Sequence, residues 1–266
     1  MGVLNITPDS FSDGGRALDP QRARDLALEM ESAGADLIDV GAESTRPGAS
    51  PVGAEDEWGR LRPVLLACAG RVRVPLSVDT YKAETARRAL DTGVSVVNDI
   101  SGLRYDPSLA SVAVSTGAAL ILMHTRGRPR EMYVQARYTD VVAEVTTELQ
   151  WSLDQAIEAG IPSDRLILDP GLGFAKQAAD SLAALARLDR LASLGRPLLV
   201  GASRKSFLTV ATGPMAPHER DWATAAAVTA AILSGAHIVR VHEVARMVQV
   251  ARVADAIRAA ASDPRL

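Results

Sequence analysis

A local pattern that recurs along the chain constrains its fold more than any other feature. In each copy a glycine is followed within a few residues by a short apolar run, and the run ends at polar residues. The glycines that begin these copies are Gly34, Gly70, Gly93, Gly117, Gly160, Gly195 and Gly235. A glycine suits the left-handed position that closes a helix, and short apolar runs suit parallel strands that are buried on both faces. The pattern therefore predicts seven helix-to-strand junctions.

Helical segments separate the apolar runs. Asp19 can cap a helix that Pro20 opens, and residues 140–160 carry apolar side chains at a helical period. Residues 2–5 supply an eighth strand. Strict alternation of strand and helix predicts a parallel sheet. Eight units in 266 residues favour closure into a (βα)8 TIM barrel over an open doubly wound sheet. We predict a single domain of this α/β class over residues 1–266.

Composition excludes several other classes of protein. The formal net charge of −3 argues against a nucleic-acid partner, which would favour a basic excess. The sequence shows neither a secretory signal nor an apolar stretch near the roughly 20 residues of a membrane span. Cys68 is the one cysteine and lies in an apolar helical phrase, so we expect a buried structural thiol. A cytoplasmic protein without a membrane partner is predicted.

Polar residues at the predicted strand ends form a candidate site. Four long loops, at residues 6–18, 41–56, 125–139 and 203–219, leave the same end of the barrel, where active sites of this fold lie. Side chains at these strand ends converge on one pocket, in which polar groups must be paired or used. The polar residues at or just beyond the strand ends are Asn5, Asp79, Asn98, Asp169, Lys205, Arg240 and His242.

These residues divide into two chemical groups. The first group offers carboxylate and amide acceptors with one ammonium donor, which suits a flat heterocycle with an amidine-like N–H edge and a carbonyl; it contains Asp79, Asn98, Asp169 and Lys205. In the second group, Arg240 and His242 lie two residues apart on a strand and can clamp an anion, phosphate above all. Asn5 offers a neutral oxygen that suits Mg²⁺ bound to such a phosphate.

Several polar residues outside these two groups are interpreted separately. Asp99 alternates away from the pocket and is predicted to cap a loop, whereas His124 stays open between lining the pocket and catalysis. Residues 126–130 are interpreted as a mobile, solvated basic loop rather than a second phosphate site. Residues 169–176 match neither dinucleotide nor P-loop spacing, so their glycines are expected to shape a turn that presents Asp169. His218 and His237 are interpreted as structural or solvated.

Several ordered motifs carry a family resemblance. Residues 2–15, GVLNITPDSFSDGG, closely resemble the first-loop motif of the dihydropteroate synthases, and residues 43–48, ESTRPG, look like the second loop of that family. Residues 78–80, 98–99, 169–171, 203–205 and 240–242 follow in the order of the family. The resemblance extends from residue 1 to the last helix.

The resemblance implies a folate-pathway transferase. Such an enzyme joins 6-hydroxymethyl-7,8-dihydropterin diphosphate to 4-aminobenzoate, forms 7,8-dihydropteroate and releases diphosphate. By similarity the pterin is held by Asp79, Asn98, Asp169, Lys205 and Arg240, of which Asp79, Lys205 and Arg240 are also implied to be catalytic. Asn5 would meet Mg²⁺ on the diphosphate, which Arg240 and His242 bind. The aminobenzoate site, where sulfonamide drugs compete, would comprise Thr45, Arg46, Pro47, Phe174, Lys205 and Ser206.

The same residues suggest how the reaction proceeds. No residue resembles an activated nucleophile, so we expect direct attack by the amine. Loops 7–15 and 45–50 are predicted to close over the site and exclude water.

The chain departs from the family at two places. Relatives usually carry residues before the first-strand motif, which leaves open whether this sequence is truncated at its N-terminus. Ala42 replaces a glycine common in the family and is expected to adjust loop packing.

Two alternatives and one further expectation remain. A corrinoid-linked pterin methyltransferase shares the pterin pocket but has no need for Asn5, Arg46 or residues 203–205. A non-catalytic pterin-binding paralogue would bind pterin without releasing diphosphate. The resemblance also suggests a homodimer through the last helices, where residues 223–233 and 244–261 are rich in Ala and Val.

Overall fold

The computed structural model describes residues 1–7, 19–45, 48–134 and 136–261. In these residues strands and helices alternate along the chain. The strands are β1 (Gly2–Asn5), β2 (Ile38–Gly41), β3 (Leu76–Asp79), β4 (Val96–Asp99), β5 (Ala119–Met123), β6 (Leu166–Asp169), β7 (Leu199–Val200) and β8 (Ile238–Val239). The α-helices are α1 (Pro20–Ser32), α2 (Ala54–Cys68), α3 (Ala83–Leu90), α4 (Ser108–Thr116), α5 (Val141–Glu158), α6 (Ala178–Ala186), α7 (Thr209–Thr212), α8 (Asp221–Leu233) and α9 (Val244–Ala261).

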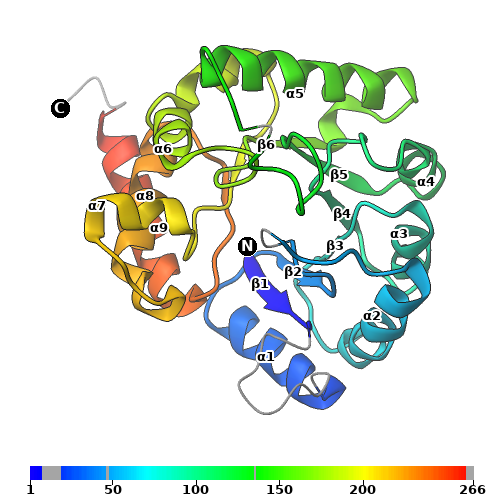
Figure 1. The fold of residues 1–266 in the computed structure, drawn as a ribbon. Coiled ribbons are helices and arrows are strands. Elements are labelled where there is room, and N and C mark those ends of the chain that lie inside the picture. The colour runs from blue at the N-terminus through cyan, green and yellow to red at the C-terminus, as the bar shows by residue number, and fades with distance from the viewer. Residues whose placement is uncertain (8–18, 46–47, 135, 262–266) are drawn as a thin grey trace.

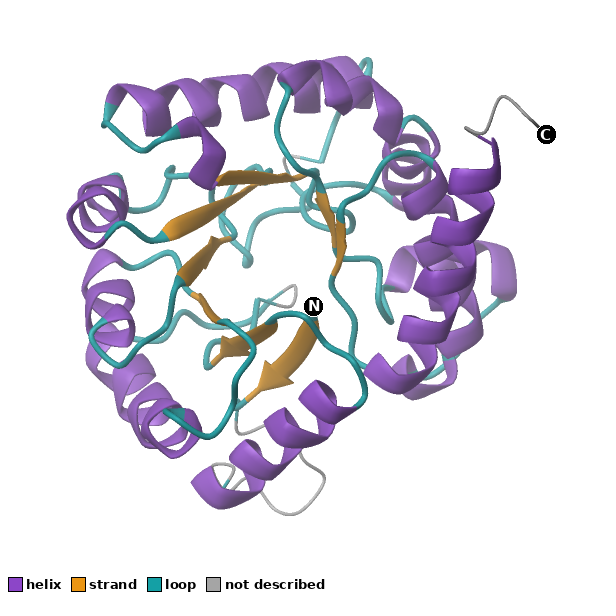
Figure 2. Cartoon of the chain, turned by 180° about the vertical axis from the view of Figure 1, so that it is seen from behind, coloured by secondary structure: helices purple, strands orange, loops and turns teal. Residues whose placement is uncertain are grey.

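The strands form a closed parallel barrel. Strands β1 to β6 pair in sequence order and β7 pairs with β8, all in parallel. Bridges between Leu168 and Leu198 and between Gly2 and Val241 join these two sets at both seams. The helices surround the strands as an outer ring (Figures 1 and 2). The predicted (βα)8 TIM barrel is therefore confirmed.

The local signals in the sequence act as expected. Asp19 caps α1 by accepting a hydrogen bond from the backbone N–H of Gln21 at 3.3 Å, and Pro20 is the first helical residue. Asp140 caps α5 by accepting from Val142 and Ala143. All seven glycines of the repeated pattern have positive φ angles, between 62° and 101°. The glycine positions therefore mark the helix-to-strand junctions as predicted.

The buried hydrophobic residues form three clusters, the third of which contains Tyr81, Ile100 and Met123. A large cluster lies between the strands and the helices and contains Cys68, whose thiol is fully buried, as predicted. Burial raises the pKa of this thiol to about 11, which makes it a poor nucleophile at neutral pH. A small cluster contains Val96 and Ile121, which the strand register places on the same face as Asn98. This second cluster is the apolar floor on which the polar residues of the barrel interior rest.

Among the described residues, none of the helices combines the length and the apolar character that crossing a bilayer requires.

Candidate active site

The strand register aligns the predicted site residues at one end of the barrel. Asn5 pairs with Gly41, Gly41 with Asp79, and Asp79 with Asn98, so these positions share one level on four neighbouring strands. Gly41 leaves space at this level, since an added Cβ would lie 3.3 Å from the Asp79 Cβ. Asp169 occupies the corresponding end of β6, opposite Met123 on β5.

Arg240 is the electrostatic centre of this level. Its Nε donates to Asp39 Oδ2 at 2.7 Å, and its Nη2 lies 2.9 Å from Asp79 Oδ2. The guanidinium therefore bridges two carboxylates from neighbouring strands in a charge-assisted arrangement. Burial raises the pKa of Asp79, with further contributions in that direction from nearby carboxylates, while Arg240 opposes the increase. Arg240 therefore contacts Asp79, which belongs to the first chemical group, although the sequence analysis placed Arg240 with His242 in the second, anion-binding group.

Asp39 is a site residue that the sequence analysis did not single out. Its fully buried carboxylate accepts hydrogen bonds from the Ser77 hydroxyl, from Asn98 Nδ2 at 2.9 Å and from Arg240. Because Asn98 donates to Asp39, its amide oxygen is left for another partner. A charged residue in the middle of an apolar strand, two residues before Gly41, was the available signal.

Asp169 and Lys205 lie at the same end of the barrel, and Asp169 is two residues beyond the level of Asn98 in the strand register. Asp169 Oδ1 accepts from the backbone N–H of Gly171 at 2.7 Å, and burial raises its pKa to about 6 against the effects of that hydrogen bond and of Lys205. The Lys205 ammonium lies 3.7 Å from the centre of the Phe174 ring. Burial, assisted by Arg240, lowers the pKa of Lys205 to about 8, whereas Asp169 and Asp79 oppose the decrease. Both groups therefore titrate near neutral pH.

His124 is enclosed between two charged side chains. Its Nδ1 lies 2.8 Å from Lys176 Nζ and its Nε2 lies 3.1 Å from Glu148 Oε2. The lysine is the donor in the first contact, so the ring proton is on Nε2 and faces Glu148. Burial lowers the pKa of His124 to about 3. Both ring nitrogens therefore contact side chains of the protein, an arrangement that favours a structural role for His124.

Two other predictions concern residues beside the site. The buried Asp99 accepts from the backbone and hydroxyl of Ser101 at 2.8 and 2.7 Å and from the Leu103 N–H at 2.6 Å, so its predicted loop-capping role is confirmed. The prediction of a solvated loop at residues 126–130 is wrong for Arg126, whose side chain is 20% exposed, whereas Arg128 and Arg130 are exposed as predicted. Arg126 pairs with Glu148 and, at 2.7 Å, with Glu144, while Arg128 lies 4.5 Å from the Tyr105 ring centre. Carboxylates of α5 and an aromatic ring, distant in sequence, provide these contacts.

The remaining predicted residues lie at the rim, in part beyond the described structure. Thr45, Phe174 and Ser206 follow β2, β6 and β7, whereas Arg46, Pro47 and most of the predicted closing loop 7–15 are outside the described residues. The Gly48 N–H contacts the Pro129 carbonyl at 3.4 Å, which joins the loops after β2 and β5. His242 is positioned by Ser203, whose Oγ lies 3.0 Å from His242 Nδ1 and accepts from its backbone N–H at 3.2 Å.

The described residues contain no group of three or more His, Cys, Asp or Glu side chains that could hold a metal ion. Asn5 supplies a single neutral oxygen at the strand end, which fits a cation that retains water and takes its other ligands from a phosphate.

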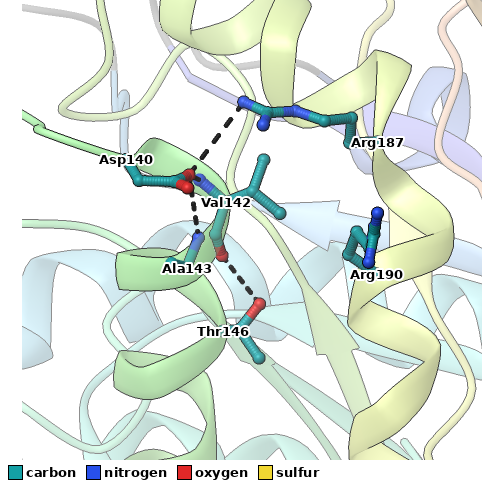
Figure 3. Close-up of a pocket in the computed structure, with 6 residues that line it drawn as sticks. All are labelled: Asp140, Val142, Ala143, Thr146, Arg187 and Arg190. Atoms are coloured by element: carbon teal, nitrogen blue, oxygen red, sulfur yellow. Dashed lines mark hydrogen bonds and ion pairs between the residues drawn. The ribbon is translucent and has the colours of Figure 1, made fainter.

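A surface hollow at the start of α5 is separate from this site (Figure 3). Two of its three charged side chains contact each other, because Asp140, which caps α5, lies 4.0 Å from Arg187 Nη2. The hollow lies between outer helical segments and contains none of the residues at the strand ends.

Comparisons with known proteins agree with this geometry. Residues 1–242 match the model of the family described as pterin binding enzyme. Dihydropteroate synthase from a Synechocystis species is 44% identical, over 97% of this chain and 89% of the relative. The Yersinia pestis dihydropteroate synthase, solved with a sulfonamide drug complex, superposes with a TM-score of 0.92 at 40% identity, covering 97% of this chain and 93% of that one. The Xanthomonas albilineans enzyme in complex with 7,8-dihydropteroate gives a TM-score of 0.87 at 38% identity, covering 97% and 92%.

The barrel fold and the match over residues 1–242 together identify a pterin-binding enzyme, and the chain belongs to that family. Within the family its relatives place it among the dihydropteroate synthases, which are transferases of folate biosynthesis.

Proposed function

We propose that this barrel condenses 6-hydroxymethyl-7,8-dihydropterin diphosphate with 4-aminobenzoate, using the two groups of strand-end residues as separate subsites. The observation that carries the proposal is that Asp79, Asn98, Asp169, Lys205 and Arg240 gather at the same end of the barrel strands. A pterin ring offers N–H donors to the carboxylates and a carbonyl to the ammonium. Each charge-assisted hydrogen bond of this kind contributes about 1.5–3 kcal/mol.

The diphosphate subsite is assigned to Asn5, His242 and Arg240. His242 is anchored through Ser203, and Arg240 is anchored through Asp39, so both side chains are positioned before substrate arrives. Mg²⁺, when bound at Asn5, would neutralise charge on the diphosphate. Arg240 and His242 would stabilise the charge that develops on the leaving oxygens.

Substitution needs no protein nucleophile. The bond between the pterin methylene carbon and the diphosphate oxygen breaks, and its electron pair leaves with the diphosphate. The carboxylate of Asp79 stabilises the positive charge that develops on the pterin. The aminobenzoate nitrogen then forms the new bond to carbon and loses a proton. Thr45, Phe174, Lys205 and Ser206 are assigned to the aminobenzoate subsite, together with Arg46 and Pro47 beyond the described residues. Loops 7–15 and 45–50 are proposed to exclude water.

Diphosphate release tests the proposed function. We expect release only when pterin diphosphate, 4-aminobenzoate and Mg²⁺ are all present. Pterin binding without diphosphate release would instead support a non-catalytic paralogue. Methyl transfer to a corrinoid acceptor would support the methyltransferase alternative.

Replacing Lys205 with alanine is expected to weaken pterin binding by about 10- to 100-fold, because one charge-assisted hydrogen bond is lost. Isothermal titration calorimetry with the pterin substrate measures this change. Ser206→Ala is the neighbouring control and should leave the pterin dissociation constant unchanged, since Ser206 is assigned to the other subsite. An unchanged dissociation constant in Lys205→Ala would remove Lys205 from the pterin pocket.

Pterin affinity is expected to be highest between about pH 6 and pH 8. The raised pKa of Asp169, about 6, means that its carboxylate becomes protonated and stops accepting as the pH falls through that value. The lowered pKa of Lys205, about 8, means that its ammonium loses a proton as the pH rises through that value. Calorimetry from pH 5 to pH 9 should give the weakest binding at both extremes. Affinity that is flat across this range would contradict the assignment of both groups.

A homodimer through the last helices is a second part of the proposal. Helices α8 and α9 pack side by side on one side of the barrel (Figure 1). They carry exposed apolar side chains, among them Trp222 at 86% exposure, Val253 and Ile257. Apolar surface of this kind marks protein interfaces. Sedimentation velocity should report a dimer, and Trp222→Glu should shift it toward the monomer.

A further inference from the structure

Lys176 is a buried charged residue that the proposed reaction does not use. Only 2% of its surface is exposed, and it is among the largest fully buried side chains of the described residues. A lysine is rarely buried to this extent unless its ammonium is paired. Its position therefore requires a physical explanation.

The Lys176 ammonium has three acceptors for its three N–H bonds. Nζ donates to the Gly171 carbonyl at 3.1 Å, to the Phe174 carbonyl at 3.2 Å and to His124 Nδ1 at 2.8 Å. The His124 ring in turn contacts Glu148 of α5. A complete set of acceptors favours the charged form, although burial lowers the pKa of Lys176 to about 7.

The two carbonyls belong to the turn that connects β6 to α6, which covers residues 170–177. The turn also contains a hydrogen bond from the Phe174 N–H to the Gly171 carbonyl at 3.0 Å. Gly171, Gly173 and Ala175 all have positive φ angles, of 66°, 77° and 46°. Left-handed backbone costs free energy at a residue with a side chain, so this conformation needs external support at Ala175. Tyr138 adds a second tether by donating to the Ala175 carbonyl at 2.8 Å.

We propose that Lys176 is a positioning residue for the aminobenzoate subsite, because it holds the backbone of Phe174 in place beneath the Lys205 ammonium. Asp169, at the start of the turn, is held by the backbone ladder of β6, which does not involve Lys176, as well as by the Gly171 N–H of the same turn. Release of the Lys176 tether therefore displaces Phe174 more than it displaces Asp169. Loss of the tether should therefore weaken the binding of 4-aminobenzoate, whose subsite includes Phe174, more than the binding of pterin.

This inference rests on the proposed function, and its test separates the two. The wild-type protein is first assayed for diphosphate release with both substrates and Mg²⁺, and an inactive wild type would sink the proposed function. With an active wild type, Lys176→Met removes the charge and all three donors while keeping the volume of the chain. The expected result is at least a 10-fold rise in the KM for 4-aminobenzoate, with a change of less than 3-fold in the pterin dissociation constant.

Two further variants test the mechanism of positioning. Lys176→Gln keeps amide donors for the carbonyls and should give a KM between those of the wild type and Lys176→Met. Arg104→Met is the matched control, because Arg104 donates to the Glu148 carbonyl at 3.0 Å and has no hydrogen bond to the turn. It should alter stability without altering either substrate constant. If Lys176→Met does not fold, Tyr138→Phe releases the same turn and should raise the aminobenzoate KM by about 2- to 5-fold.

Two results would overturn the proposal. In the first, the variants of the turn lower only the midpoint of thermal unfolding, and the folded protein keeps the wild-type KM for 4-aminobenzoate and the wild-type dissociation constant for pterin. In the second, aminobenzoate and pterin are affected equally, which would show that the tether supports the whole site rather than the Phe174 end of the turn.

Discussion

Replacing Arg240 with methionine is expected to lower the free energy of unfolding by about 3–5 kcal/mol. The guanidinium bridges the buried carboxylates of Asp39 and Asp79, and a methionine leaves both without their counter-ion. Removal of one partner from a buried ion pair is costly because the remaining charge stays desolvated. Urea denaturation at fixed pH measures the change.

The loss is also expected to depend on pH. Without Arg240 the folded-state pKa of Asp79 rises further above its unfolded value, because the group that lowers it has gone. A carboxyl group with a raised folded pKa contributes stability at low pH, and this contribution is lost as the pH rises through that pKa. The deficit of Arg240→Met relative to the wild type should therefore be smaller at pH 5 than at pH 8.

Arg246→Met provides the control for this variant. Arg246 Nη1 lies 3.7 Å from Asp221, but its side chain is 68% exposed, so the pair is screened by solvent. We expect the free energy of unfolding of Arg246→Met to be close to that of the wild type. If Arg240→Met were as stable as this control, the ion pairs at the centre of the barrel would contribute nothing net.

Replacing Gly171 with alanine is expected to disrupt the turn after β6 and to abolish most of the transferase activity. Gly171 has a φ of +66°, and an added Cβ would lie 2.0 Å from the His124 carbonyl oxygen. Because this neighbour is backbone, it cannot move away as the end of a flexible side chain does. The turn must shift, and with it the Gly171 N–H that binds Asp169.

Gly70→Ala is a matched control for the backbone conformation. Gly70 also has a φ of +66°, but an added Cβ there meets no atom within 4 Å. This variant should lose about 1–2 kcal/mol, the cost of left-handed backbone alone, and keep full activity. Gly171→Ala should lose more stability and most of its activity, as measured by denaturation and diphosphate release. Equal effects at the two positions would contradict the close approach between Gly171 and His124.

The sequence by itself determined the barrel and most of the ring of polar residues. Several of its signals are local and act within a few residues: glycine at helix ends, cap residues such as Asp19 and Asp140, and short apolar runs. Strand alternation is also local, so the inward position of Asn98 and the outward position of Asp99 followed from their order in one strand. The named reaction came from ordered motifs shared with a family.

Only the tertiary structure decided how the charged residues pair. Arg240 binds Asp39 across 201 positions of the chain, and no spacing rule predicts such a contact. Lys176 contacts His124 across 52 positions of the chain, a pairing that no local pattern around either residue indicates. Arg126, expected to be solvated, instead pairs with α5 carboxylates that the fold brings to it. Strand ends are set by local backbone geometry, whereas the choice among several carboxylates for one arginine depends on distances that exist only after the barrel has closed.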